Sequence, residues 1–161
     1  MEPRSAIPKV VGILMIIFAT LALVLGLRSL VQDAGGGMFG NVAAFKTWNR
    51  IELVFDVVGL AISALHLYAG FRAMGYKTNA PRVAFGYGVI SIVVGLIQGA
   101  LLFAWIKPML DEAFRVLEIS GGSTVFGGFM MFALLLGLAW PILVIILMTR
   151  PAAKAACVNE L

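Results

Sequence analysis

Charged residues are scarce in this sequence. Only 12% of its 161 residues are Asp, Glu, Lys or Arg, whereas 61% are hydrophobic. Soluble domains carry about 25% charged residues, since a surface that faces water needs them. This composition excludes a soluble globular fold. It also excludes a disordered chain, because such an apolar sequence does not stay solvated in water. We therefore predict an integral membrane protein, with a single transmembrane domain over residues 1–161.

Cysteine and histidine each occur once, as Cys157 and His66. A lone thiol excludes an intramolecular disulfide, a cysteine-based zinc site and an iron–sulfur cluster. A lone histidine excludes bis-histidine ligation of haem. We therefore expect no metal and no cofactor. Cys157 is interpreted as a tail residue, with S-palmitoylation as the alternative.

The basic residues flank apolar runs and do not form a cluster in the sequence, although the net charge is +4. Such flanking charges orient helices in the bilayer and contact anionic lipid headgroups. We expect the lipid bilayer to be a partner of this chain and nucleic acid not to be one.

Four apolar runs are long enough to cross a membrane, which takes about 20 residues at about 1.5 Å each. They are residues 10–27, 53–71, 83–106 and 126–148. The first run is longer than the apolar core of a signal peptide, and no small-residue cleavage site follows it, so we expect it to be retained. The sequence predicts an all-α integral membrane protein, a four-transmembrane-helix bundle. Residues 108–119 have amphipathic spacing and predict an interfacial helix or a kinked continuation of the third span.

The distribution of Lys and Arg predicts the orientation. Seven lie on the side of the termini and the second loop, and five lie on the other side, spread over longer loops that also contain acidic residues. Cytoplasmic loops are enriched in Lys and Arg, so we place both termini in the cytoplasm. The single cysteine and the abundant small residues favour a bacterial inner (plasma) membrane.

A polar and small-residue face follows the second span. Its members recur at steps of three and four: Asn49, Glu52, Asp56, Gly59, Ser63, His66 and Gly70. This spacing places all seven on one face of one helix. A companion row lies on the third span: Ala84, Gly88, Ser91, Gly95 and Gln98.

An antiparallel hairpin of the second and third spans, turning at Lys77, brings these two rows together. At equal depth it pairs Asp56 with Gln98, Gly59 with Gly95, Ser63 with Ser91, His66 with Gly88 and Gly70 with Ala84. Helices associate in lipid through close packing of small residues and through hydrogen bonds. We therefore predict helix packing through Gly59, Gly70, Gly88, Ser91 and Gly95. Small residues on the first and fourth spans as well, such as Gly12 and Gly137, favour self-association.

Two interpretations of the polar residues stay open. In one, Glu52, Asp56, Ser63, His66 and Gln98 line an ion or proton pathway, because ionisable groups inside a membrane usually have a function. In the other, these residues form a hydrogen-bonded seam between helices.

Catalysis is disfavoured by the spacing and by the motifs. Asp56 and His66 lie about 15 Å apart along one helix, which is too far to share a metal or a proton. The sequence has neither a nucleophile turn nor a phosphate-binding loop, so we assign no catalytic residue and no metal site. We predict a non-enzymatic inner-membrane protein, an oligomeric assembly or accessory subunit that contacts copies of itself or another membrane protein. The alternative is a small ion channel or proton-coupled transporter.

Overall fold

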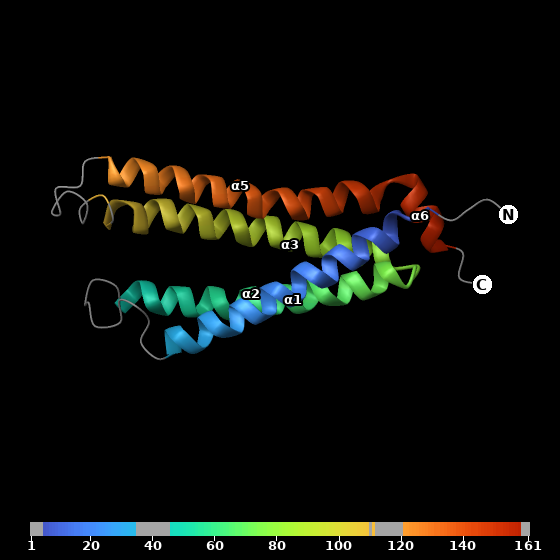
Figure 1. Cartoon of the computed structure of the whole chain (residues 1–161), viewed down its shortest axis with the longest axis horizontal. Helices are drawn as coiled ribbons and strands as arrows, with labels where there is room; N and C mark the ends of the chain where they lie inside the picture. The colour runs from blue at the N-terminus through green and yellow to red at the C-terminus, as the bar shows by residue number, and fades with distance from the viewer. Residues whose placement is uncertain (1–4, 35–45, 110, 112–120, 159–161) are drawn as a thin grey trace. The chain divides into compact units, whose positions relative to one another are not determined.

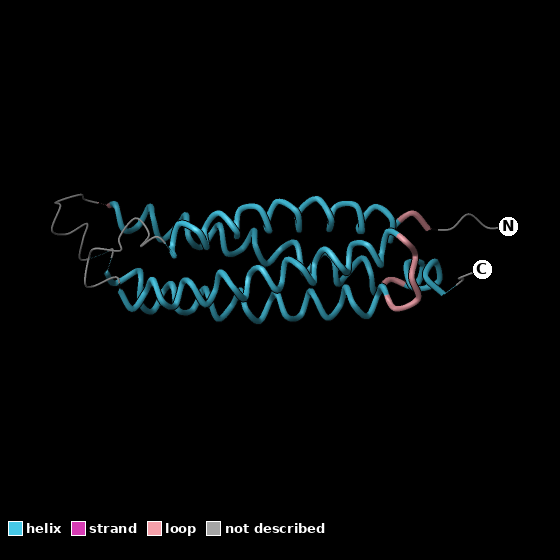
Figure 2. Tube along the Cα trace, turned by 90° about the horizontal axis from the view of Figure 1, so that it is seen from below, coloured by secondary structure: helices cyan, strands magenta, loops and turns pink. Residues whose placement is uncertain are grey.

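The computed structural model describes residues 5–34, 46–109, 111 and 121–158, and every regular element among them is helical (Figure 1). In chain order the elements are α1 (Ile7–Ala34), α2 (Lys46–Met74), α3 (Ala80–Leu101), the π-helix η2 (Leu102–Ile106), α5 (Gly122–Thr149) and α6 (Pro151–Val158). Figure 2 shows that helices make up nearly all of the described chain, with short loops beside them. The prediction of an all-helical protein is confirmed.

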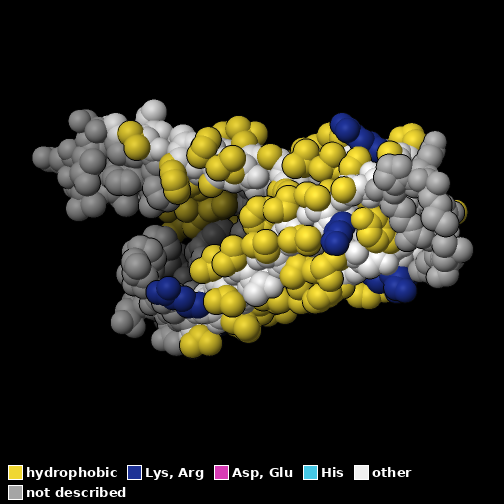
Figure 3. Space-filling view, turned by 45° about the vertical axis from the view of Figure 1, so that its right-hand side comes forward, with side chains coloured by type: hydrophobic (Ala, Val, Ile, Leu, Met, Phe, Trp, Pro, Cys, Tyr) yellow, Lys and Arg dark blue, Asp and Glu magenta, His cyan; other side chains and the backbone are white. Residues whose placement is uncertain are grey.

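Four of the described helices are long and apolar enough to cross a membrane. The candidate spans are Ile7–Val31, Leu53–Met74, Ala80–Met109 and Gly127–Thr149. In the most apolar stretch of each span only 11–22% of the residues are buried, so most hydrophobic side chains point outward, as lipid-facing helices require. On the face in Figure 3, hydrophobic side chains run along the helices, and Lys and Arg are few. The prediction of four helices able to cross a membrane is confirmed.

The chain forms two compact units. The first contains Met1–Tyr87 and Ile145–Leu161, and the second contains Gly88–Val144. The single transmembrane domain expected over residues 1–161, and both termini lying in the cytoplasm, stay predictions.

In the first unit, α1 and α2 form an antiparallel pair. A Cβ atom added to Gly12 would lie only 2.5 Å from the backbone nitrogen of Met74 and 2.7 Å from the carbonyl oxygen of Gly70. Further along α1, a Cβ at Gly26 would lie 3.1 Å from the side chain of Leu60. Contacts therefore move toward the start of α2 as α1 advances. Because glycine has no side chain, the two helix backbones meet directly at Gly12, as in other small-residue helix contacts in membranes.

A short turn joins α2 to α3. The Tyr76 amide donates a hydrogen bond to the Ala73 carbonyl (3.1 Å), and the Lys77 amide donates one to the Arg72 carbonyl (3.0 Å). This pair of bonds is the Schellman pattern that closes helix C-termini. It places Tyr76 in the left-handed region, with φ of 52°. The chain therefore turns at Lys77, whereas the antiparallel course of α2 and α3 beyond Tyr87 stays a prediction.

A π-helical segment ends the third span. The Lys107 amide bonds to the Leu102 carbonyl, one residue further back than in an α-helix. Pro108 follows directly, and a proline ring clashes with the carbonyl four residues earlier. The wider π turn relieves that clash. Of the amphipathic segment expected over residues 108–119, residues 110 and 112–119 lie outside the described part of the chain.

Candidate functional site

The polar face of α2 has a buried centre. The side chains of Ser63 and His66 are only 8% and 5% exposed, and they are the buried polar residues of the described chain. Because they lie three positions apart on a helix, they share one face. Their burial agrees with both interpretations of this face, since a packed seam and an enclosed pathway each remove polar groups from lipid.

The ring of His66 stacks on the ring of Tyr87, which lies near the start of α3. The ring centroids are 4.1 Å apart and the planes are inclined by 13°. Tyr87 is itself only 5% exposed, so the two rings form a buried stack within the first unit. Stacked ring pairs contribute about 0.5–1.5 kcal/mol beyond the area that they bury. His66 is therefore used to hold the beginning of α3 against the later part of α2.

Asp56 lies ten residues before His66, which corresponds to about 15 Å along the helix. Its side chain is half-buried, and its Oδ2 atom is buried without a hydrogen-bond partner within the described part of the chain. A buried carboxyl oxygen without a partner is costly, and ionisable groups within membrane spans are commonly functional. Among the described residues of this face, Asp56 therefore has a buried polar atom that no hydrogen bond satisfies.

The assignment of Glu52 and Gln98 to the pathway stays a prediction. The side chain of Glu52 lies outside the described residues, as does that of Asn49. Gln98 is exposed and belongs to the second unit. Of the five residues predicted for an ion or proton pathway, the structure therefore places Ser63 and His66 together.

The residues predicted for helix packing differ in the residues that surround them. A Cβ at Gly70 would lie 3.0 Å from the carbonyl oxygen of Gly12, so Gly70 meets α1, while Gly59 has open space around it. In the second unit, a Cβ at Gly95 would lie 3.2 Å from the Leu138 side chain of α5. Gly88 is buried and Ser91 is half-buried, with the Ser91 hydroxyl lacking a hydrogen-bond partner among the described residues.

Sequence reasoning did not assign two of these contacts. It recognised Gly12 as one of the small residues of the first span but did not pair it with Gly70. It also did not single out Gly99, where an added Cβ would lie 2.8 Å from Leu134 of α5. The signal for both contacts was a small residue within an apolar run. That signal marks a place of close approach without naming the partner helix.

Cys157 is fully buried in α6, together with Ala153 and Ala156. Burial raises the pKa of its thiol, because a thiolate is poorly solvated there. A buried, protonated thiol is a poor nucleophile and a poor acceptor for an acyl chain. The structure thus favours the interpretation of Cys157 as a structural tail residue over its alternative, palmitoylation.

Within residues 5–34, 46–109, 111 and 121–158, no three His, Cys, Asp or Glu side chains lie close enough together to hold a metal ion. Comparisons with protein-family models, with curated proteins and with solved structures find no match for this chain. What the fold defines is a class: an all-helical chain with four helices able to span a membrane.

Proposed function

We propose that this chain is a small multi-pass protein of the bacterial inner (plasma) membrane with no catalytic activity, acting as an oligomeric assembly or accessory subunit. The observation that carries the proposal is the buried His66–Tyr87 stack, with Ser63 buried on the same face of α2. These polar groups take part in internal packing. The α2–α3 hairpin and the cytoplasmic position of both termini are parts of the same proposal.

The surface of the helices supports an oligomeric role. Large hydrophobic side chains are exposed along all four candidate spans, for example Leu25, Val54, Leu96 and Phe132. Such surfaces are compatible with lipid and with other membrane helices. Exposed small residues such as Gly137 allow a second helix to come close, since helices in lipid associate by close packing. The expected partner is a second copy of the chain or another membrane protein.

A non-enzymatic role is supported by the spacing of the ionisable groups. Asp56 and His66 are about 15 Å apart along α2, so they do not act on one bond or share one proton. The ring of His66 stacks on the ring of Tyr87. This arrangement resembles a packing element more than a general acid–base pair, which needs groups within hydrogen-bonding reach.

Asp56 favours a second candidate function, a small ion channel or proton-coupled transporter. Its buried Oδ2 atom has no hydrogen-bond partner in the described part of the chain, and a carboxylate can accept a cation or a proton. In this alternative Glu52, Asp56, Ser63, His66 and Gln98 contribute to the pathway.

Reconstitution into liposomes separates the two functions. For an assembly subunit, we expect proton and potassium flux at the level of protein-free vesicles. Asp56→Asn and His66→Ala should then change thermal stability in detergent and leave vesicle permeability unchanged. Flux above background that Asp56→Asn abolishes, and that the control Asp111→Asn retains, would instead establish the transport function. Asp111 suits the control because it forms an ion pair with Lys107 at the end of the third span.

The oligomeric part needs its own measurement. Light scattering of the detergent-solubilised chain, corrected for bound detergent, should give a protein mass of two or more times the 17.2 kDa of one chain. A monomer at every protein concentration would refute self-association, and the partner would then have to be another membrane protein.

A further inference from the structure

One end of the first unit carries charge of a single sign. Six basic residues lie there: Lys9, Arg72, Lys77, Arg82, Arg150 and Lys154. Described residues 5–12, 70–85 and 145–158, which form this end, contain no Asp or Glu. Glu2, Arg4 and Glu160 lie outside the described residues, and counting them leaves a clear positive excess. We call this set of six residues the basic end.

The basic end is a spatial cluster because several elements begin or end there. Gly12 of α1 meets Gly70 and Met74 of α2, which places the start of α1 beside the end of α2. The turn at Lys77 leads directly into α3, and α6 contacts α1 (Figure 1). All these segments belong to the first unit. The six charges therefore lie at or near the ends of neighbouring helices, close to the ends of the candidate spans.

Arg72 is held in a fixed position within this end. Its Nε donates a hydrogen bond to Oδ1 of Asn79 at 2.6 Å, and its guanidinium carbon lies 6.0 Å from the centre of the Tyr68 ring. A guanidinium has five N–H donors, and this bond uses one of them. The two terminal nitrogens make no further hydrogen bond or ion pair within the described residues. A positioned arginine fork with free donors is suited to bind a phosphate group with two parallel hydrogen bonds.

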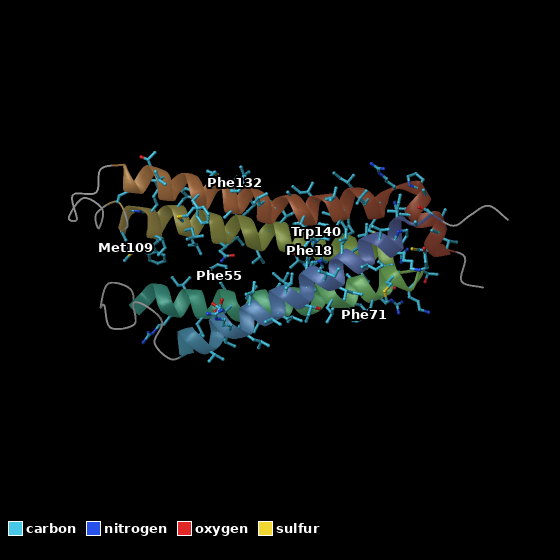
Figure 4. The ribbon with its side chains drawn as sticks, in the orientation of Figure 1. Phe18, Phe55, Phe71, Met109, Phe132 and Trp140 are labelled. Atoms are coloured by element: carbon cyan, nitrogen blue, oxygen red, sulfur yellow. The ribbon has the colours of Figure 1, made fainter. Side chains whose placement is uncertain are left out.

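Exposed aromatic side chains lie beside this arginine. Tyr68 and Phe71 are 50% and 52% exposed and belong to the last turns of α2, where Figure 4 labels Phe71. When a ligand binds Arg72 through an anionic group, the part of the ligand that is attached to that group contacts these rings. The surroundings are therefore amphiphilic, with donors on one side and apolar rings on the other.

We propose that the basic end is a binding site for anionic phospholipids, in which Arg72 binds the headgroup phosphate and Tyr68 and Phe71 contact the upper acyl chain. The other five basic residues supply the preference for lipids with a net negative charge, since each Lys or Arg near an anionic surface strengthens its attraction. Asn79 is a positioning residue, because it acts through Arg72. The site is independent of whether the chain is an assembly subunit or a transporter.

Native mass spectrometry of the full chain tests this proposal. The protein is released from detergent micelles containing equal amounts of phosphatidylglycerol and phosphatidylcholine, and the retained lipids are counted. We expect the wild type to retain phosphatidylglycerol in preference. The double variant Lys77→Gln with Arg82→Gln leaves the Arg72–Asn79 bond in place, and it should weaken phosphatidylglycerol binding roughly fivefold for each charge removed. Arg72→Lys keeps the charge but loses the fork, and should also reduce retention.

A matched control uses basic residues of α1 and α2 that lie far from the basic end. Arg28→Gln with Arg50→Gln removes the same charge from α1 and α2, and both residues are exposed. Phosphatidylglycerol retention should be unchanged in this control. Equal retention of both lipids by the wild type, or equal losses in the two double variants, would overturn the proposal. Displacement of the lipid by millimolar inorganic phosphate would also overturn it, because the site would then bind a soluble anion.

Circular dichroism shows whether each variant is folded, so that a loss of lipid binding is not confused with a loss of structure. Each variant should retain the helical spectrum of the wild type in detergent. For Arg72→Lys, lipid retention is compared with that of Asn79→Ala, which keeps the arginine and removes its hydrogen bond. Unchanged preference in both would refute the role of the positioned fork.

Discussion

Replacing Gly12 by alanine tests the closest contact between α1 and α2. A Cβ at this position would lie 2.5 Å from the Met74 nitrogen, 2.7 Å from the Gly70 oxygen and 3.0 Å from the Met74 Cα. All three are backbone atoms of α2, so no side-chain rotation relieves the overlap. The helices must move apart, and ordinary contact at 3.4 Å requires a separation of about 1 Å at this point.

The energetic cost follows from that separation. A gap of 0.5–1 Å forfeits about a quarter to a half of the dispersion energy at each contact, and overpacking typically costs about 1–3 kcal/mol. Because the overlap is with backbone atoms, we place the cost of Gly12→Ala at the upper end of this range. Alanine regains about 1 kcal/mol relative to glycine in helix propensity. We therefore expect Gly12→Ala to lower the free energy of unfolding by about 2 kcal/mol.

Two further glycines of α2 provide a graded comparison. A Cβ at Gly70 would lie 2.9 Å from the Ile16 side chain and 3.0 Å from the Gly12 oxygen, so Gly70→Ala should destabilise less than Gly12→Ala. Gly59 has nothing within 4 Å, and Gly59→Ala should stabilise by up to about 1 kcal/mol. Unfolding by SDS in mixed micelles, followed by circular dichroism, measures all three. Equal stability of Gly12→Ala and Gly59→Ala would refute the close backbone contact.

Predictions for three other residues follow from the same structure. Tyr76 occupies the left-handed region at φ 52°, which costs a residue with a side chain about 1–2 kcal/mol, so Tyr76→Gly should be more stable than Tyr76→Ala by about 1 kcal/mol in the SDS titration. Equal midpoints would contradict this strain. Burial raises the pKa of Cys157, so stability should be complete below pH 9.0 and fall as the pH rises above it, since the unfolded chain then ionises more readily. The variant Cys157→Ala should lose this dependence, and maleimide should label Cys157 more slowly than the exposed Val158→Cys in that background; fast labelling of the native thiol would exclude its burial. His66→Phe should keep the stack on Tyr87, and His66→Ala should be less stable than His66→Phe by about 0.5–1.5 kcal/mol in thermal unfolding. Similar losses in both would show that the ring contact is not what stabilises this position.

The four candidate spans were predictable because hydropathy is a local property. Residues 10–27 were predicted for the first span, and the structure extends it to Ile7–Val31. The second span likewise begins at Leu53 as predicted and continues to Met74. Helices run past the last apolar residue because backbone groups near the membrane still need hydrogen bonds. Flanking basic side chains, such as Lys9 and Arg28, can reach the interface from within the helix.

The candidate site was predictable only in part. The three-and-four spacing places Ser63 and His66 on one face, since it depends on the geometry of a single helix, and both side chains are buried. The stack of His66 on Tyr87 did not follow from that spacing, although the proposed pairing with Gly88 came within one residue of it. A tyrosine near the end of a span also suits the membrane interface, so its position in the sequence does not by itself indicate a packing role.

Composition and periodicity by themselves determined that this is a helical chain with four candidate membrane spans, because each candidate span needs only its own apolar residues and its own hydrogen bonds. Only the tertiary structure decided that Gly70 meets Gly12 of α1 and that Gly95 meets Leu138 of α5. The physical reason is that a small residue permits close approach from any neighbouring helix. Which helix takes that place depends on how all the side chains around it fit together.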